Sequence, residues 1–401
     1  MDVKSLFRQY YIERFPRQPT VSELQRREFA FVMFDRDGMV RHISFTNWSE
    51  LMKFLIANVP KHVYYSSARY SDPDAPTMEE KGWLGADLVF DIDVDHIPTQ
   101  CKSLHDKWWC QKCGASGWGS YEVCPKCGGE KIVRESWVCT TCLSVARDET
   151  LKLIDFLTSD FGFAEEELKV YFSGHRGFHV HIEEEEVLKL GQDERREIAD
   201  YIRGLGLDPS IYLENAGRRR YTVRYPPNPG WGERIARSVY AILSCATGEE
   251  LARFGVAKRA ADALAAQIAR LASSSMDEFF SRIALPLNTW IKIFDKAVEL
   301  ERANIDEKVT IDIKRLIRLP YSLHGKTGFM VREFKVSDLE DPDIVRKVVA
   351  FSDEEVYVHV ANPPKRVLDF NVNDKGKVRV PLYLAVYLTL NSRESVAIEP
   401  I

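Results

Sequence analysis

The residues with the clearest chemical potential are three aspartates at alternating positions, Asp91, Asp93 and Asp95, within the segment 88–96. In an extended strand successive side chains point to opposite faces, so the three carboxylates would share one face and apolar residues the other. Carboxylates held this close raise one another's pKa unless a cation lies between them. Mg²⁺ and Mn²⁺ take such oxygen ligands together with water and phosphate. The alternation therefore predicts a divalent-metal site rather than a solvated acidic face.

A glycine-containing segment further along the chain offers groups that bind anions. Ser173-Gly-His175-Arg176-Gly lies between two predicted strands, 168–172 and 178–182. A hydroxyl, backbone N–H groups freed by glycine, a guanidinium and the imidazole of His179 together favour a phosphate-binding turn. His181 shares the strand face of His179, but for a single histidine a core or surface role is the commoner one.

A late segment combines one more aspartate with a basic run. Asp312 lies in the apolar stretch 310–313, which the pattern predicts to be a strand, and Arg318, His324 and Lys326 follow it. We expect Asp312 to reach the metal site from another strand as a third ligand. The basic side chains would then neutralise a triphosphate.

The cysteines are concentrated in one block. Seven of the eight fall between positions 101 and 142. Cys110-Gln-Lys-Cys113 and Cys124-Pro-Lys-Cys127 lie ten residues apart, which is typical of a tetrahedral Cys₄ zinc ribbon. In a reducing compartment such pairs indicate a metal rather than disulfides.

The remaining cysteines of the block, with one histidine, are predicted to form a second zinc site, whose ligands lie before and after the ribbon in the sequence. Its members are Cys101, His105, Cys139 and Cys142. Spacing alone also allows a different pairing, in which Cys110 and Cys113 share a zinc with Cys139 and Cys142. Four protein ligands leave no open position, so each zinc should be structural. Cys245 stands apart and is predicted to be a small core residue.

Composition sets the broad class. The chain has 401 residues, 45% hydrophobic residues and a net charge of −5, so any basic surface must be local. The densest group of basic residues, between positions 218 and 224, could bind the phosphates of a template strand. A set of solvent-exposed charges without a ligand explains it equally well. No run of 18 apolar residues or signal peptide is seen, and we expect an intracellular protein. The basic cluster comprises Arg218, Arg219, Arg220 and Arg224.

The order of predicted elements indicates a mixed α/β domain with two insertions. Strands and helices alternate up to residue 100 and again over 143–185, with the cysteine block 101–142 between them. Residues 186–305 read as mainly helical, and strand patterns return over 306–401. We therefore expect a catalytic core in three pieces, a zinc-binding module and a helical insertion.

Taken together these segments resemble the catalytic small subunit of archaeal and eukaryotic DNA primases. The resemblance runs from about residue 25 to 330, and no single motif carries it. The resembling segments are the Asp91/Asp93 strand, the Ser173/Arg176/His179 turn, Asp312 with the run 318–328, Arg27-Glu28-Phe29 with 41–45, and Tyr65 to Tyr70. His175 stands where some relatives carry a second arginine, and the ribbon Cys110–Cys127 is an insertion that many lack.

The resemblance implies roles for these residues. Asp91, Asp93 and Asp312 would hold two Mg²⁺ or Mn²⁺ ions. A second group would bind the triphosphate and sugar of the incoming nucleotide, and a third would make peripheral contacts. The second group is Ser173, Arg176, His179, Arg318, His324 and Lys326, and the third is Arg27, Arg41, Tyr65 and Arg69.

The resemblance also implies an α+β primase-polymerase core, with two small sheets, flanking helices, a zinc-binding stem and a helical insertion. The expected activity is template-directed primer synthesis on single-stranded DNA from NTPs or dNTPs by two-metal nucleotidyl transfer. A primase large subunit is the expected partner, and the expected location is the cytoplasm, at the nucleoid. A repair or end-joining polymerase of the same superfamily is the alternative.

Overall fold

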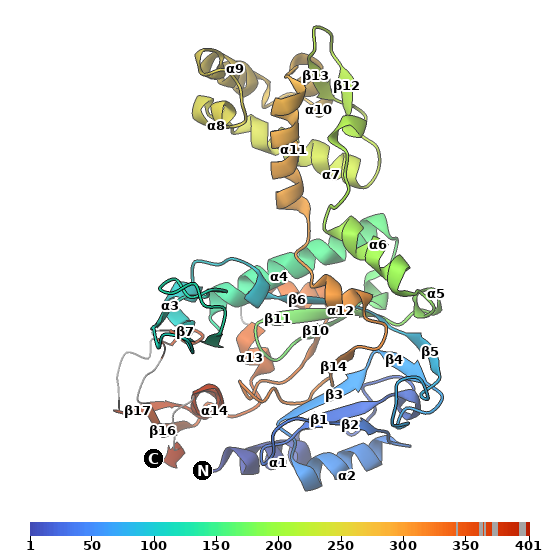
Figure 1. Ribbon diagram of the computed structural model, residues 1–401, viewed down its shortest axis with the longest axis vertical. Coiled ribbons are helices and arrows are strands. Elements are labelled where there is room, and N and C mark those ends of the chain that lie inside the picture. The colour runs from blue at the N-terminus through green and yellow to red at the C-terminus, as the bar shows by residue number, and fades with distance from the viewer. Residues whose placement is uncertain (342–343, 361–363, 365, 371–375, 393–397) are drawn as a thin grey trace. The chain divides into compact units, whose positions relative to one another are not determined.

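The computed structural model describes residues 1–341, 344–360, 364, 366–370, 376–392 and 398–401 (Figure 1). The chain forms two compact units. The first comprises 1–151, 164–196 and 305–401, and the second comprises 152–163 and 197–304. None of the described helices has the length and apolar content that crossing a membrane requires.

Two four-stranded sheets form the centre of the first unit, and the first of them is antiparallel. Its central strand packs Phe29 and Phe31 against the ring of Phe45, with centroids 5.2 and 6.2 Å apart. Helices α1 (Val3–Glu13) and α2 (Trp48–Asn58) lie along this sheet (Figure 1). Its strand order is β14 (Leu316–Arg318), β3 (His62–Ser66), β1 (Phe29–Val32) and β2 (Met39–Ile43).

The second sheet brings together the two predicted functional strands. In its antiparallel register Asp91 lies opposite His179, and Asp93 lies opposite Gly177. Gly177 is required here, because a Cβ atom at this position would lie 2.1 Å from the carbonyl oxygen of Ile92. The strand order is β15 (Glu333–Phe334), β10 (Lys169–Phe172), β11 (Gly177–Ile182) and β6 (Leu88–Asp93). The expected α+β fold with small sheets is confirmed.

Two local predictions about aspartates are wrong. β6 ends at Asp93, and Asp95 lies in a 3₁₀ turn over Val94–His96, because the Asp93 carboxylate accepts a hydrogen bond from the Asp95 N–H at 2.8 Å. Asp312 does not lie in a strand but directly follows the short helix α12 (Glu307–Ile311). This helix forms despite its β-branched residues, since Asp306 caps it and its apolar side packs against β6.

Smaller sheets and helices complete the first unit. Two-stranded and three-stranded sheets flank the core, and one three-stranded sheet carries the cysteine block. The strands are β4 (Ala68–Tyr70) with β5 (Trp83–Ala86); β17 (Gly376–Pro381), β16 (Glu355–Val360) and β18 (Ile398–Pro400); and β8 (Ser116–Trp118), β7 (Lys107–Cys110) and β9 (Ile132–Glu135). The helices are α3 (Lys102–His105), α4 (Thr140–Asp155), α5 (Glu185–Leu188), α13 (Ile344–Val348) and α14 (Leu382–Asn391), and α4 continues into the second unit.

The second unit is mainly helical. Its helices α7 and α11 pack together through buried apolar residues, among them Ile235, Trp290 and Phe294. Cys245 ends α7 and is exposed, so its predicted core position is wrong. The elements are α6 (Gln192–Ile202), which begins in the first unit, β12 (Leu213–Asn215), β13 (Tyr221–Val223), α7 (Trp231–Ser244), α8 (Gly248–Arg253), α9 (Lys258–Leu271), α10 (Met276–Arg282) and α11 (Leu287–Glu301).

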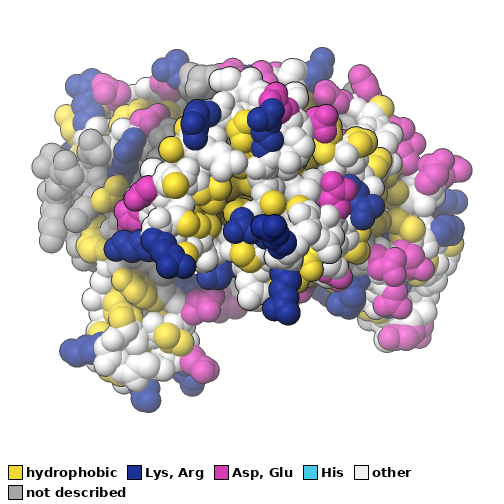
Figure 2. All heavy atoms as spheres, turned by 90° about the horizontal axis from the view of Figure 1, so that it is seen from above, with side chains coloured by type: hydrophobic (Ala, Val, Ile, Leu, Met, Phe, Trp, Pro, Cys, Tyr) yellow, Lys and Arg dark blue, Asp and Glu magenta, His cyan; other side chains and the backbone are white. Residues whose placement is uncertain are grey.

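Surface charge is mixed. On the face that Figure 2 shows, Lys and Arg side chains are interspersed with Asp and Glu side chains and do not form one continuous basic field. This agrees with the net charge of −5 and indicates that any anion-binding surface is local.

Candidate active site and metal centres

A cavity of about 400 Å³ opens between the two four-stranded sheets of the first unit. Its volume lies within the range of small-molecule binding sites in proteins, roughly 300–1,000 Å³. One side carries carboxylates and the other basic groups, so the cavity suits a ligand with cations on one side and phosphates on the other. The lining residues are His62, Tyr64, Asp91, Asp93, Asp95, Ser173, His175, His179, Val309, Arg315, Leu316, Ile317, Arg318, His324 and Lys326.

The acidic side is built by the register of β6 and β11. His179 Nε2 lies 3.2 Å from Asp91 Oδ1, so the imidazole orients that carboxylate. Burial, and then the nearby carboxylates of Asp95 and Asp91, raises the pKa of Asp93 to about 6. Although burial opposes it, the Arg176 guanidinium lowers the pKa of Asp95. A divalent cation would relieve the excess negative charge on this wall.

The basic side contains an arginine held by a histidine. Arg318 Nη1 lies 2.7 Å from His62 Nδ1, and the Gly325 N–H donates to the same nitrogen at 3.2 Å. Burial, and then the charge of Arg318, lowers the pKa of His62 to about 2, so this imidazole is a neutral acceptor. Burial also lowers the pKa of His324 well below its usual value. In the free protein the positive charge on this side therefore comes from arginine and lysine.

Ser173 and His175 belong to the turn between β10 and β11. The Ser173 N–H donates to the Gly177 carbonyl at 2.9 Å and closes the turn. Gly174 adopts φ +86°, and a Cβ atom there would lie 2.6 Å from His324 Cβ, so the turn approaches the basic side closely. The rings of His175 and His324 stack with centroids 5.4 Å apart. The turn therefore meets the basic run at the cavity.

Two of the residues predicted to bind the divalent metals or the nucleotide, Asp312 and Arg176, do not line the cavity. Asp312 accepts a hydrogen bond from the Lys314 N–H at 2.9 Å. Asp91, Asp93 and Asp312 are not among the described groups whose ligand atoms all lie within 4.8 Å of one another. Arg176 points into the protein and is buried. Its Nη1 and Nη2 donate to Asp106 Oδ1 and Oδ2 at 2.9 Å each. This inward orientation conflicts with the expected contact between Arg176 and a nucleotide.

The residues expected to make peripheral contacts have internal partners instead. Arg27 is fully buried and binds Asp87 at 2.7 Å, and Arg69 binds the same carboxylate at 3.2 Å. The Tyr65 hydroxyl lies 3.3 Å from His181 Nδ1, which leaves His181 a buried core histidine. Arg41 is paired in the same way, with Glu28 at 3.1 Å.

The structure brings the cysteines together in two clusters, in the pairing that encloses one set within the other. In each cluster the ligand atoms all lie within 4.8 Å of one another. Sulfur–sulfur distances of 3.5–3.8 Å are far longer than a disulfide and close to those that a tetrahedral zinc with bonds of about 2.3 Å imposes. The knuckle cluster is Cys101, His105, Cys139 and Cys142, and the ribbon cluster is Cys110, Cys113, Cys124 and Cys127.

The basic arginines lie on the β12–β13 hairpin of the second unit. Arg218 and Arg219 both occupy the left-handed backbone region, with φ of 52° and 60°. Both are exposed, whereas Arg220 Nη1 also donates to the Ala284 carbonyl at 2.9 Å. Two consecutive arginines in a conformation that favours glycine cost free energy, and such strain is a reason to look for a function.

Sequence reasoning missed His62, Tyr64 and Asp106. His62 and Tyr64 lie in the ordinary strand β3, and nothing in their spacing relates them to a run of residues more than 250 positions later. Asp106 had one signal, its position directly after the predicted metal ligand His105, because ligating histidines usually donate to a carboxylate.

Comparisons with known proteins agree with these features. The family model for the DNA primase small subunit matches residues 129–336. Proteins named DNA primase small subunit PriS are similar along almost their whole length. They include those of Methanothrix thermoacetophila, with 35% identity over 96% of this chain and 96% of the relative, Methanococcoides burtonii, with 36% over 96% and 95%, and Pyrobaculum calidifontis, with 34% over 97% and 97%.

A solved structure, the polymerase domain of Mycobacterium tuberculosis Ligase D in complex with DNA, covers 82% of this chain and 70% of its own at 11% identity. Its TM-score of 0.26 is too low to support any argument. The identities of about one third over almost the full length of the relatives are decisive by themselves. The chain belongs to the DNA primase small subunit family.

Proposed function

We propose that this chain is the catalytic subunit of a DNA primase, a DNA-directed nucleotidyltransferase that synthesises short primers on a single-stranded template from NTPs or dNTPs. The observation that carries the proposal is the cavity itself. It has Asp91 and Asp93 on one side and Arg318 and Lys326 on the other, with the Ser173 turn beside them. A nucleoside triphosphate with its divalent cations has the matching distribution of charge.

Divalent cations fit the acidic side. The carboxylates of Asp91 and Asp93 offer hard oxygen ligands, and the raised pKa of Asp93 reflects negative charge that burial leaves uncompensated. When bound, Mg²⁺ or Mn²⁺ supplies charge stabilisation for the attacking and leaving oxygens. Asp91 and Asp93 would hold the ions, and His179 would orient Asp91. Asp312 does not line the cavity, so it would join as a third ligand only if bound cations draw its carboxylate towards the other two.

The residues on the basic side would bind the triphosphate. Arg318 and Lys326 would neutralise the phosphate oxygens, and Ser173 would donate its hydroxyl to one of them. His62 would keep the Arg318 guanidinium in place through the 2.7 Å contact. His324 would serve as a neutral hydrogen-bonding group. These residues thereby orient the nucleotide and stabilise the charge on its leaving group.

The template would be held partly by electrostatic contacts from the second unit. The arginines of the β12–β13 hairpin are exposed, apart from the bond that Arg220 makes, and would bind phosphates of the single strand. The set is Arg218, Arg219, Arg220 and Arg224.

The structural metal of both cysteine clusters would be zinc, because the thiolate-rich tetrahedral donor sets suit it. A primase large subunit would complete the enzyme, since priming without an existing end requires a second nucleotide to be held beside the first. The same proposal places the enzyme in the cytoplasm, at the nucleoid.

The test is incorporation of labelled NTPs or dNTPs on unprimed single-stranded DNA with Mn²⁺, with and without the large subunit. Short products without any primer would support the proposal. Extension of primed or broken ends, combined with none on the unprimed strand even with the large subunit present, would instead support the repair or end-joining polymerase.

A further inference from the structure

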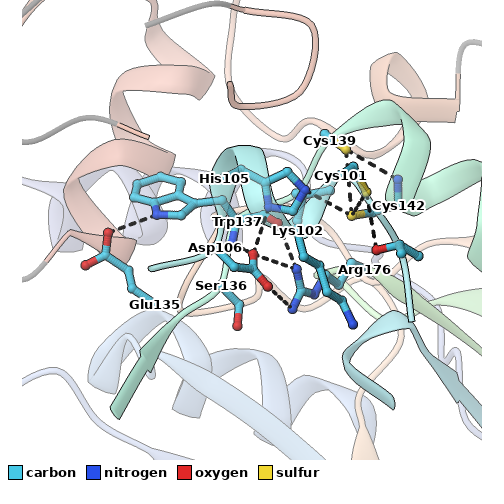
Figure 3. A network of polar contacts seen from close by, with 12 residues as sticks. Cys101, Lys102, His105, Asp106, Glu135, Ser136, Trp137, Cys139, Cys142 and Arg176 are labelled. Atoms are coloured by element: carbon cyan, nitrogen blue, oxygen red, sulfur yellow. Dashed lines mark hydrogen bonds and ion pairs between the residues drawn. The ribbon is translucent and has the colours of Figure 1, made fainter. Parts of the chain in front are cut away.

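A continuous set of charged contacts joins the knuckle cluster to the acidic wall of the cavity. Figure 3 shows its first part, from His105 through Asp106 to Arg176. The contacts run from His105 through Asp106 and Arg176 to Asp95. All four residues belong to the first unit.

The contacts begin at His105, which approaches a cysteine of the knuckle cluster with one ring nitrogen and Asp106 with the other. His105 Nε2 lies 3.4 Å from Cys142 Sγ, and Nδ1 lies 2.8 Å from Asp106 Oδ1. This is the arrangement in which a carboxylate fixes the tautomer and ring orientation of a metal-ligating histidine. The position of Asp106 is therefore tied to the geometry of the cluster.

The middle of the path is a buried ion pair. Only 3% of the Asp106 side chain is exposed, and it accepts both Nη groups of Arg176 and the Trp137 N–H at 3.1 Å. Arg176, with 1% of its side chain exposed, uses its remaining Nε edge to donate to Asp95 Oδ1 at 2.5 Å. One guanidinium therefore connects a carboxylate beside the knuckle cluster to a carboxylate of the cavity wall.

The far end reaches the expected cation ligands. Asp95 lines the cavity, and its N–H donates to Asp93 Oδ1 at 2.8 Å. A second connection starts beside Cys101, where Lys102 Nζ donates to the carbonyls of Val94 at 2.6 Å and Ile97 at 2.7 Å. The knuckle cluster thus holds both the side chain of Asp95 and the backbone of its 3₁₀ turn.

We propose that Asp106 and Arg176 are positioning residues through which the knuckle cluster sets the divalent-cation affinity of the cavity. Arg176, which Asp106 holds in place, fixes the Asp95 carboxylate and with it the backbone N–H that donates to the Asp93 carboxylate. Without this pairing a buried charge is left alone, and the Val94–His96 turn loses one of its two anchors. The inference rests on the proposed function, because it requires zinc in the knuckle cluster and Mg²⁺ or Mn²⁺ at Asp91 and Asp93.

The test measures Mn²⁺ binding to the full chain without nucleotide, with free Mn²⁺ counted by electron paramagnetic resonance, and zinc content measured on the same samples. Asp106→Asn removes the charge but hardly changes the shape. We expect zinc to be retained and Mn²⁺ to bind about tenfold more weakly. Arg176→Lys, which keeps one charge but cannot reach two carboxylates, should weaken Mn²⁺ binding in the same way if Asp106→Asn does not fold.

The matched control is Asp87→Asn, which breaks a similar buried carboxylate–arginine pair with no contact to the knuckle cluster. It should lower thermal stability but leave Mn²⁺ affinity unchanged. Unchanged Mn²⁺ affinity in the zinc-loaded Asp106→Asn and Arg176→Lys proteins would overturn the inference, and so would an equal loss in Asp87→Asn. Absence of Mn²⁺ binding in the unaltered chain would instead contradict the proposed function.

Discussion

Asp91 and His179 face each other across the β6–β11 pair, with 3.2 Å between Oδ1 and Nε2. The strand register fixes this contact, so it does not depend on a bound ligand. His179→Ala should therefore leave the fold intact but release the Asp91 carboxylate. We expect kcat/KM for nucleotide incorporation to fall about 10- to 100-fold. Steady-state kinetics of the purified variant measures this, with His181→Asn, a buried histidine of the same strand, as the control. Equal losses in both variants would argue against a specific role for His179.

The raised pKa of Asp93 predicts how cation binding depends on pH. A cation binds the deprotonated carboxylate, so below about pH 6 protons compete with it. Apparent Mn²⁺ affinity should fall by up to about tenfold per unit of pH below 6 and level off above it. Titration of the chain with Mn²⁺ between pH 5 and 8 checks this, and an affinity independent of pH would contradict it.

The same shift predicts stability in the absence of added divalent cation. Because the folded-state pKa of Asp93 lies above its ordinary value of 3.8, the folded chain holds this proton more tightly than the unfolded chain. Stability from this group is therefore greatest at low pH, and it is lost as the pH rises towards about 6. At pH 8 Asp93→Asn should be more stable than the unaltered chain by roughly 1 kcal/mol, allowing for its partial exposure. Thermal unfolding of both proteins at pH 8 checks this. An equal melting temperature would contradict the prediction that the ionised Asp93 carboxylate destabilises the fold.

Gly177 should be intolerant of any side chain. Its missing Cβ is what lets β11 approach the Ile92 carbonyl, so Gly177→Ala should cost about 3 kcal/mol and weaken the pairing that holds Asp91 and Asp93. Gly191→Ala is a suitable control, because a Cβ there meets only the flexible carboxylate of Glu194. Chemical denaturation of the two variants should separate them clearly, whereas equal stability would contradict the close approach.

How far the site could be predicted depends on how local its determinants are. Strand periodicity acts over a few residues, so it could place Asp91 and Asp93 on one face of a strand. The pairing of β6 with β11, which brings Asp91 to His179, is long-range, and only the family resemblance implies it. CxxC spacing predicts metal clusters in the cysteine block but leaves two pairings open, and the structure forms the nested one. The inward direction of Arg176 could not be predicted, since it depends on Asp106, 70 residues earlier.

Other misses have similar causes. The β-branched residues around Asp312 favoured a strand, but the cap at Asp306 and packing against β6 produce helix α12 instead. His62 acquires its role only because β3 pairs with β14, which brings Arg318 to it. Long-range strand pairing of this kind leaves no mark in the spacing of the residues.

The β12–β13 hairpin allows a test in which stability and binding change in opposite directions. Glycine adopts positive φ freely, so Arg218→Gly with Arg219→Gly should relieve strain and stabilise the second unit by up to about 1 kcal/mol. The same change should weaken binding of single-stranded DNA. The slope of log K against log salt concentration should become shallower by about 0.7 for each phosphate that the hairpin no longer neutralises. Binding measured at several salt concentrations checks this, and an unchanged salt slope would remove the hairpin from the template site.

The most direct measurement of the central claim is incorporation of labelled nucleotides on unprimed single-stranded DNA by Asp91→Asn, compared with the unaltered chain and with Asp87→Asn. Asparagine keeps the shape of Asp91 but loses the charge that a cation requires. We expect incorporation to fall below detection in Asp91→Asn, with unfolding behaviour unchanged, and to persist in Asp87→Asn at temperatures where that variant remains folded. Primer synthesis by Asp91→Asn at a rate close to that of the unaltered chain would contradict the assignment of this cavity as the active site.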